Sequence, residues 1–456
     1  MKSTIINTAK EMTAYSDFPP QTQFANFMHN RQMLKYLEQY AQFHGLYPYI
    51  RFQHTVLGVY RSDDYDVTRK WRVEYKNENG IHEETFDCVL LCQGHHVKPN
   101  LAGTNWPDRD LFKGRVIHSH SYKDTKDFED SVSVVVGVGN SGVDIAVELS
   151  RVCKKVYLST RRGSWIQCRV GSYGQPLDME RLTRFKQCYL PRLMPNALAE
   201  WLLIRRLQER FDHAKFGLMP KHSPFSQHGT INDELPNRII SGTVSVKPNI
   251  KRFTSTGVIW EDGSYHFDFS LVEHGQFIPV HENRCHLYKH IWPVAQSNHN
   301  SLGVVGLIQG NILPVAEMQA RAFFAVFTEN SRLPSKEEIM KEIENGQENM
   351  LKRFVKSSRH TIQIDHISFM DSLASIIDCM PRPFSYVLSD PKLAHNLIFV
   401  ANCSYAYRLR GPHAWPGARD ALLTAQYRTD ACLSDRDPGV FWKDGFQILA
   451  ANFCTY

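Results

Sequence analysis

"SVVVGVGNSGVD", residues 133–144, is the stretch that decides the fold class of this chain. Its first half is a run of small apolar residues typical of a buried strand, and its second half starts an apolar helical pattern. Three glycines, Gly137, Gly139 and Gly142, separate the halves with the spacing GxGxxG. A strand, a glycine-rich turn and a helix in this order indicate a dinucleotide-binding unit. We therefore expect an α/β protein.

Each glycine of the loop has a separate expected role. Gly137 permits a tight turn, Gly139 lets backbone approach a pyrophosphate, and Gly142 lets helix and strand pack closely. The start of the helix then offers free N–H groups to phosphate oxygens. The predicted cofactor-binding loop consists of Gly137, Val138, Gly139, Asn140, Ser141 and Gly142. The alternative is a glycine-rich turn that holds no ligand.

The end of the next strand distinguishes between the two nicotinamide dinucleotides. An NAD site places Asp or Glu there, about 20 residues after the loop, to hold the ribose 2′-hydroxyl. This chain has Ser159, Thr160, Arg161 and Arg162 instead, with no acid. Because an acid would repel a 2′-phosphate and arginine would bind it, we expect NADP(H), held by Thr160, Arg161 and Arg162. The alternative is that both arginines are solvated loop charges.

Composition limits the remaining functions. The 456 residues suffice for two or three domains, and the net charge of +6 is spread among acids. The densest basic cluster lies just after the glycine loop and consists of Lys154, Lys155, Arg161 and Arg162. This cluster favours one anionic small molecule as partner and argues against nucleic acid. The ten cysteines form no CxxC pair and no metal-ligand spacing, which predicts no metal site and a reducing compartment. The sequence shows no signal peptide and no apolar run near the roughly 18–20 residues that span a bilayer.

Apolar periodicity predicts the other elements. The expected helices cover residues 30–44, 141–152, 196–211, 314–327 and 335–356. The expected strands cover residues 47–60, 70–76, 86–92, 131–139, 154–162, 251–264 and 301–310, with a hairpin turn at 77–80.

Two of these helices carry further expectations. Asn30 is expected to cap the helix at 30–44. Ser335 and Glu338 are expected to form a capping box at the start of the helix at 335–356. The apolar stripe of the first helix consists of Leu34, Leu37, Tyr40 and Phe43, and that of the second of Ile339, Ile343, Met350 and Phe354.

A longer motif lies just before the glycine loop. Phe112, Gly114, His118 and Tyr122 have the spacing FxGxxxHxxxY. With this motif the chain resembles the flavin-containing monooxygenases of the dimethylaniline monooxygenase type, whose identifying motif it is. Related Baeyer–Villiger enzymes typically carry Trp at the position of Tyr122, which favours the amine- and sulfide-oxidising branch. The resemblance covers almost the whole chain through the segments NTAKEM, DFPP, NFMHN, CQGHH, STRRGSW, LPNRI, PVAEMQAR, RHTIQID and YRLRGP.

The resemblance implies two Rossmann-like dinucleotide-binding domains, with the NADP domain inserted into a discontinuous FAD domain. Residues 1–125 would be the first part of the FAD domain, and residues 296–456 its second part with the C-terminal region. Residues 126–295 would be the NADP domain, with a helical insertion at about 166–240.

The resemblance also implies an activity. NADPH would reduce FAD, the reduced flavin would capture O2 as a C4a-hydroperoxide, and a soft amine nitrogen or sulfide sulfur of a small molecule would take the outer oxygen. The family's catalytic asparagine falls on Asn7, which with Thr8 would contact the cofactors; the alternative is a turn asparagine. His118 is expected to be a structural histidine of a linker. The segment EMQAR (317–321) would lie next to the flavin, although helix packing explains it equally well.

The chain departs from the family pattern at two places. The family's first strand, with its own GxGxxG for FAD, has no counterpart, a difference of roughly fifty residues or one βαβ unit. A strand expected after the turn at 261–264 is also missing, and Gln93 replaces a small hydroxyl residue. Losing central strands would leave apolar sheet edges exposed. The alternative function is therefore a truncated, catalytically inactive member that retains NADP(H) binding or acts only as a partner of a full-length subunit.

Localisation is also inferred from the resemblance, which implies the endoplasmic reticulum membrane, whereas the sequence itself leaves a cytosolic protein open. Residues 196–211 combine apolar side chains with arginines, so that this helix could lie in a membrane interface. Packing on the rest of the protein is the alternative. A homo-oligomer is left open.

Overall fold

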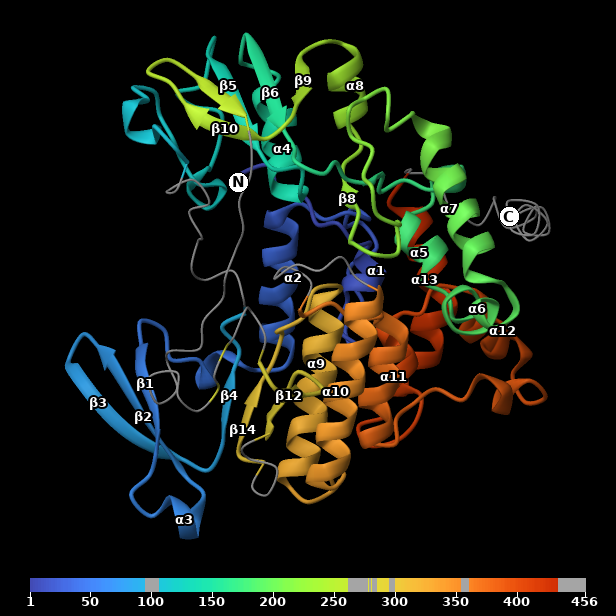
Figure 1. Ribbon diagram of the computed structural model, residues 1–456. Coiled ribbons are helices and arrows are strands. Elements are labelled where there is room, and N and C mark those ends of the chain that lie inside the picture. Colours follow the sequence, from blue (N-terminus) through green and yellow to red (C-terminus); the bar gives the residue numbers. More distant parts are fainter. Residues whose placement is uncertain are drawn as a thin grey trace.

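A computed structural model describes residues 1–94, 106–260, 278, 280, 285–294, 300–353 and 361–433 (Figure 1). A parallel sheet and its helices form the upper part of the view, and a second group of strands and long helices forms the lower part. A green helical segment runs between them on the right. The strand and turn expected at 251–264 are described only as far as residue 260, so the predicted gap after it lies outside the described residues.

The upper sheet has three parallel strands in the order β5-β6-β9. These are β5 (Val132–Val136), β6 (Lys155–Ser159) and β9 (Val244–Lys247). The helix α4 (Asn140–Leu149) connects β5 to β6 and packs on both strands. Its buried face shares an apolar core with β6 and β9. This strand–helix–strand unit with parallel strands confirms the α/β fold class.

The lower part is built around two parallel strands, β4 (Val89–Leu91) and β14 (Leu302–Val304). The long helix α9 (Ile312–Phe327) follows β14 and packs against α11 (His366–Ile376). Next to them stands α10 (Lys336–Arg353) (Figure 1). The largest apolar core of the described residues lies here.

An antiparallel sheet flanks the lower part. It consists of β1 (Thr55–Arg61), β2 (Trp71–Asn77) and β3 (Gly80–Phe86) in sequence order. The expected hairpin turn at 77–80 joins β2 to β3, and Asn77 pairs with Gly80. Residues 47–49, expected to begin a strand, form a 3₁₀ turn instead, in which Pro48 at the second position cannot donate a ladder hydrogen bond.

The segment 166–240 is mainly helical. Its helices are α5 (Leu177–Arg181), α6 (Leu190–Leu193), α7 (Asn196–Arg210) and α8 (Leu235–Ile240). Two short parallel strands, β7 (Ile166–Gln167) and β8 (Thr230–Ile231), bring the two ends of this segment together.

The remaining α-helices and strands are α1 (Lys10–Thr13), α2 (Asn30–Phe43), α3 (Tyr65–Thr68), β10 (Ile250–Phe253), β11 (Val258–Trp260), β12 (Leu287–Tyr288), β13 (Trp292–Pro293), α12 (Pro391–Phe399) and α13 (Ala418–Ala431). Of these, α12 and α13 contribute buried residues to the largest core.

The structure corrects the expectations for α2. Asn30 is the first helical residue and not the cap, because its side chain donates hydrogen bonds to the carbonyls of Met1 and Lys2. His29 caps the helix instead, and its Nδ1 accepts from the Arg31 N–H. The buried residue of α2 is Tyr36, whereas Leu34 and Phe43 of the expected stripe are exposed.

The capping box of α10 is confirmed. The Ser335 N–H donates to Glu338 Oε2 at 2.9 Å, and the Glu338 N–H donates to Ser335 Oγ at 3.3 Å. Ile339 of the expected stripe is buried and Ile343 packs against the core. Phe354 lies outside the described residues.

The outer strand of the upper sheet has an exposed apolar face. Among the described residues β5 pairs only with β6, which leaves its other edge open. Val132, Val134 and Val136 point to the same face and are 64%, 37% and 43% exposed.

Within the described ranges, no helix is both long and apolar enough to cross a membrane.

Candidate cofactor-binding site

The three glycines of the loop have three different environments. Gly137 has a φ of +103°, a conformation that side chains rarely adopt. A Cβ atom at Gly142 would lie 2.1 Å from the Gly137 carbonyl oxygen, so α4 meets the turn at contact distance. A Cβ atom at Gly139 would have no neighbour within 4 Å among the described residues. Gly137 is thus required by the turn and Gly142 by the close packing of α4. Gly139 faces open space.

The start of α4 is suited to an anion. Gly139 is its N-cap, and no side chain within the described part of the chain caps the helix. The first N–H groups of a helix have no intrahelical partners and carry the positive end of the helix dipole. A phosphate at Gly139 could therefore accept hydrogen bonds from the N–H groups at the start of α4.

The strand β8 supports the loop from the side. The Thr230 hydroxyl donates to the Val138 carbonyl oxygen at 2.5 Å, and the Ile231 N–H donates to Asn140 Oδ1 at 2.8 Å. The next residue, Asn232, donates from Nδ2 to Asp144 Oδ1 on α4 at 2.8 Å. Asn140 therefore contributes to the loop's shape through its oxygen.

The residues expected to select NADP(H) lie at the same edge of the sheet as the loop. The register pairs Val136 with Ser159, and the Gly137 N–H donates to the Ser159 carbonyl oxygen at 2.9 Å. Thr160 follows, and its hydroxyl accepts from the Gly163 N–H at 3.1 Å. Arg161 and Arg162 are both exposed at this edge. The structure thus brings the loop and the arginines to one side of the sheet.

The FxGxxxHxxxY motif attaches the preceding segment to this unit. Tyr122 is buried, and its hydroxyl donates to Glu148 Oε2 on α4 at 3.1 Å. The imidazole Nδ1 of His118 accepts from the His120 N–H at 3.1 Å at the start of a 3₁₀ turn. In the described contacts both side chains hold the segment in place.

Asn7, the expected catalytic residue, is held by a residue far away in the sequence. Its Oδ1 accepts a hydrogen bond of 2.6 Å from Arg169 Nη2, and Arg169 Nε donates to the Ile6 carbonyl oxygen at 3.3 Å. Arg169 also pairs with Asp233, next to β8. The neighbouring Thr8 hydroxyl contacts the Thr13 hydroxyl at 2.5 Å. Asn7 is therefore part of an ordered polar contact between residues 6–9 and the segment 166–240.

A carboxylate of α5 holds the same stretch at a second point. Asp178 Oδ2 accepts from the Ala9 N–H at 2.7 Å, and Asp178 Oδ1 accepts from the Met179 N–H at 3.0 Å. Burial raises the pKa of the Asp178 carboxyl to about 6, although the hydrogen bonds from Ala9 and Met179 oppose this rise. At neutral pH the charged form accepts both hydrogen bonds.

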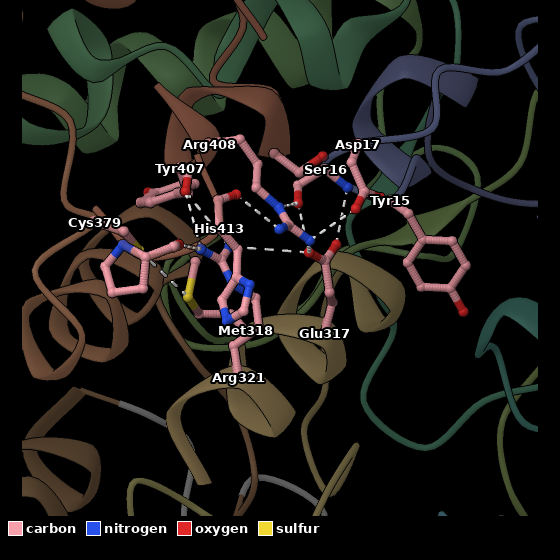
Figure 2. Close-up of polar contacts among 12 residues, drawn as sticks. Tyr15, Ser16, Asp17, Glu317, Met318, Arg321, Cys379, Tyr407, Arg408 and His413 are labelled. Carbon is pink, nitrogen blue, oxygen red and sulfur yellow. Dashed lines mark hydrogen bonds and ion pairs between the residues drawn. The ribbon is translucent and has the colours of Figure 1, made fainter. Parts of the chain in front are cut away.

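The residues that follow Asn7 are anchored to the lower part by partly buried ion pairs (Figure 2). Arg408 donates from Nη2 to Asp17 Oδ2 and to Glu317 Oε1, both at 2.9 Å, and from Nε to Ser16 Oγ at 2.6 Å. Glu317 also accepts from the Ser16 N–H and hydroxyl. The expected flavin-side segment 317–321 therefore contacts Ser16 directly through Glu317, and Asp17 through the shared Arg408.

A second cation, Arg321, completes this cluster (Figure 2). Its hydrogen bonds to the carbonyl oxygens of Tyr407 and Pro412 are long, at 3.3–3.4 Å, and its Nη1 lies 3.9 Å from Glu317 Oε1. Its Nε has no partner among the described residues. Burial lowers the pKa of Arg321, and the nearby positive charge of Arg408 lowers it further.

Another buried pair fixes α1. Glu11 is fully buried, and Arg428 donates to both of its carboxylate oxygens, at 2.9 and 2.6 Å. The Tyr405 hydroxyl donates to Glu11 Oε2 at 3.0 Å. Asn7 thus lies one turn before a helix that is locked to α13.

Sequence reasoning did not identify Arg169, Asp178 or Thr230 as site residues. Each acts on a partner that is more than 90 residues away, so no local spacing indicates it. The only hint in the sequence was that Arg169 follows shortly after the segment STRRGSW, residues 159–165, at the predicted cofactor site.

The fold and the glycine loop define a class of protein that binds a dinucleotide at an α/β sheet edge. Residues 1–441 match the model of the flavin-binding monooxygenase-like family. The chain therefore belongs to this family.

Similar proteins include flavin-containing monooxygenase 5 from Oryctolagus cuniculus, with 43% identity over 442 residues, or 94% of this chain and 82% of the relative. The human protein of the same name is 42% identical over 445 residues, with the same coverage of each chain. Dimethylaniline monooxygenase [N-oxide-forming] 2 from Oryctolagus cuniculus is 37% identical over 442 residues, again 94% and 82%. These relatives are flavin monooxygenases.

Solved structures of similar fold include S-allyl-L-cysteine S-oxygenase from Allium sativum. Its TM-score is 0.59 at 22% identity, and the match covers 95% of this chain and 84% of that chain. Cyclohexanone monooxygenase from Rhodococcus sp. Phi1, bound to NADP+, has a TM-score of 0.55 at 13% identity, with 82% and 88% covered. These matches confirm the two-domain dinucleotide-binding fold class.

Proposed function

We propose that this chain is an NADPH- and O2-dependent flavin monooxygenase that oxygenates soft nitrogen or sulfur atoms of small amines or sulfides. The observation that carries the proposal is the link from the glycine loop through β8, Asp233 and Arg169 to Asn7. This link holds the expected catalytic amide in a fixed relation to the dinucleotide loop. Membership in a family of flavin monooxygenases supports the reaction type.

The described residues fit NADP(H). Gly139 leaves space for a pyrophosphate, and the start of α4 has no side-chain cap within the described residues. Thr160, Arg161 and Arg162 would hold the 2′-phosphate, because the strand that precedes them ends without an acid. Bound there, the dinucleotide would supply a hydride.

The fit to FAD is partial. The flavin would supply the oxygen-transfer chemistry, and Asn7 is the described residue that would face it. GxGxxG occurs once in the 456 residues, at Gly137, and that loop is assigned to NADP(H). Asn7, held by Arg169, would orient a bound group and exclude water on its side.

A second function is supported by the loop at the start of α4, which is suited to a dinucleotide phosphate. In this function the protein would bind NADP(H) without oxygenating a substrate, or would act beside a full-length subunit. An absorption spectrum of the purified protein separates the two functions. A yellow protein with one FAD per chain supports the monooxygenase, and a colourless protein that NADPH stabilises in a thermal melt supports the second function.

Substitution of Arg161 tests whether the protein prefers NADPH over NADH. We expect Arg161→Ala to weaken binding of NADPH by roughly tenfold or more and to leave binding of NADH nearly unchanged, because a charge-assisted hydrogen bond to the 2′-phosphate is lost. Dissociation constants for both dinucleotides can be measured by fluorescence titration. Equal losses for NADPH and NADH would contradict the assignment of the 2′-phosphate site.

The proposal includes a peripheral contact with the endoplasmic reticulum membrane through α7. Trp201 and Leu198 of this helix are 54% and 45% exposed, whereas Leu207 is buried. The Arg205 guanidinium lies 5.7 Å from the centre of the Trp201 ring. An exposed aromatic residue beside a cation is typical of helices that lie in a membrane interface.

Liposome flotation tests this contact. The double variant Trp201→Glu, Leu203→Glu should bind anionic vesicles at least several-fold more weakly, because two acids would enter the interface. The matched control is Val67→Glu, at an 86% exposed apolar position of α3 in the antiparallel sheet region. Unchanged flotation of the double variant would reject α7 as the contact.

A further inference from the structure

Arg169 joins two parts of the protein with one side chain. Its guanidinium is 12% exposed. On one side its Nη1 and its backbone N–H donate to the two carboxylate oxygens of Asp233, at 3.0 and 2.9 Å. On the other side it donates to the Ile6 carbonyl oxygen and to Asn7 Oδ1. A planar guanidinium with donors on several edges is suited to such a bridge.

This contact fixes the orientation of the Asn7 amide. A side-chain amide has an accepting oxygen and a donating NH2 group, and rotation by half a turn exchanges them. The Arg169 cation can bond only to the oxygen, and charge-assisted hydrogen bonds are roughly twice as strong as neutral ones. The NH2 group of Asn7 has no partner among the described residues, so it is the end that remains for a ligand.

The other end of the bridge reaches the dinucleotide loop. Asp233 directly follows Asn232, whose side chain donates to Asp144 on α4. Two residues before Asp233, the Ile231 N–H donates to Asn140 Oδ1 of the loop. The stretch 230–233 therefore contacts the loop and α4 on one side and Arg169 on the other.

We propose that Arg169 is a positioning residue that makes Asn7 a hydrogen-bond donor to the bound cofactors and keeps it in register with the glycine loop. This inference rests on the proposed function, since it assumes that NADP(H) binds at the loop. Arg169 acts through Asn7 and not by touching the cofactor. Asp233 holds Arg169 in turn.

A double-mutant cycle for NADPH affinity tests the proposal. Asn7→Ala should weaken NADPH binding by roughly fivefold, the effect of one ordinary hydrogen bond, and Arg169→Gln should do the same. If Arg169 acts through Asn7, the double variant should also lose only about fivefold. Independent effects would multiply to about 25-fold and would overturn the proposal.

Controls separate positioning from folding. Arg206→Gln removes an ion pair to Glu180 in the same helical region without contacting residues 6–9, and NADPH affinity should stay unchanged. Arg169→Lys should recover part of the affinity, because one donor to Asn7 is restored. Thermal melts without NADPH show whether each variant is folded. Arg169 would have a purely structural role if Arg169→Lys recovers no NADPH affinity and if the losses of the two single variants multiply in the double variant.

The result is distinguishable from a failure of the proposed function. If the parent protein is colourless but binds NADPH, the monooxygenase proposal fails and the cycle still decides the role of Arg169. If the parent protein does not bind NADPH, both are overturned.

Discussion

Gly142→Ala is expected to lower the free energy of unfolding by about 3 kcal/mol and to abolish NADPH binding. The added Cβ would lie 2.1 Å from the Gly137 carbonyl oxygen and 3.1 Å from its carbonyl carbon, both backbone atoms that cannot rotate away. Either α4 must move off β5 or the turn at Gly137 must open. Either movement displaces the N–H groups at the start of α4. Chemical denaturation and fluorescence titration with NADPH measure the two losses.

Gly139→Ala is the matched control. Its Cβ would meet no described atom within 4 Å, and its φ of −83° suits any residue. The free energy of unfolding should therefore change by less than about 1 kcal/mol, while NADPH binding should fall, because the methyl group stands where backbone would approach the pyrophosphate. If Gly139→Ala binds NADPH normally, the phosphate does not lie at this glycine.

Arg408→Met is expected to destabilise the protein by about 3–5 kcal/mol, the second large effect. The substitution leaves the carboxylates of Asp17 and Glu317, which are only 17% and 11% exposed, without their shared cation (Figure 2). Arg321 Nη1 lies 3.9 Å from Glu317 Oε1, a long ion pair that offsets only part of this loss. Unfolding in urea, with far-UV circular dichroism as the signal, measures the loss.

Arg410→Met is the corresponding control two residues further on. Arg410 donates from Nη1 and Nη2 to the two carboxylate oxygens of Asp378, at 2.9 Å each. Asp378 is 71% exposed, so water and salt screen this pair. The urea midpoint should hardly change. A similar loss for both variants would show that burial does not set the strength of the Arg408 cluster.

Local sequence patterns were sufficient for the parts of the fold in which each residue contacts neighbours close in the sequence. The loop glycines lie between one strand and one helix, and their spacing alone predicts the turn at Gly137 and the close packing at Gly142. The box of Ser335 and Glu338 closes within one turn. These features are visible in the sequence because every partner is within a few residues.

Local patterns failed where contacts with residues far away in the sequence determine the position of a side chain. Asn30 has good capping chemistry, but its amide bonds to Met1 and Lys2. Tyr36 is buried because its hydroxyl donates to the Phe18 carbonyl oxygen and accepts from the Tyr15 N–H, which no helical period predicts. Likewise, the contact between Arg169 and Asn7 joins residues 162 positions apart.

For the candidate site, the sequence predicted the identity of the loop residues and the family, and these predictions needed only motifs. It could not predict how Asn7 is oriented, because that depends on Arg169 and Asp178 from another part of the chain. The roles of the individual cofactor-binding residues stay predictions.

The two backbone hydrogen bonds of Ile6 couple the region of α2 to that of Arg169. The Ile6 N–H donates to the Met28 carbonyl oxygen at 3.0 Å, in the segment before α2, and the Ile6 carbonyl oxygen accepts from Arg169. One residue is thus fastened from opposite sides. A hinge rotation that separates the region of Arg169 from that of α2 must break one of these bonds and displace Asn7 at the same time. If a dinucleotide is released by such a rotation, the Asn7 amide loses its position in the same movement.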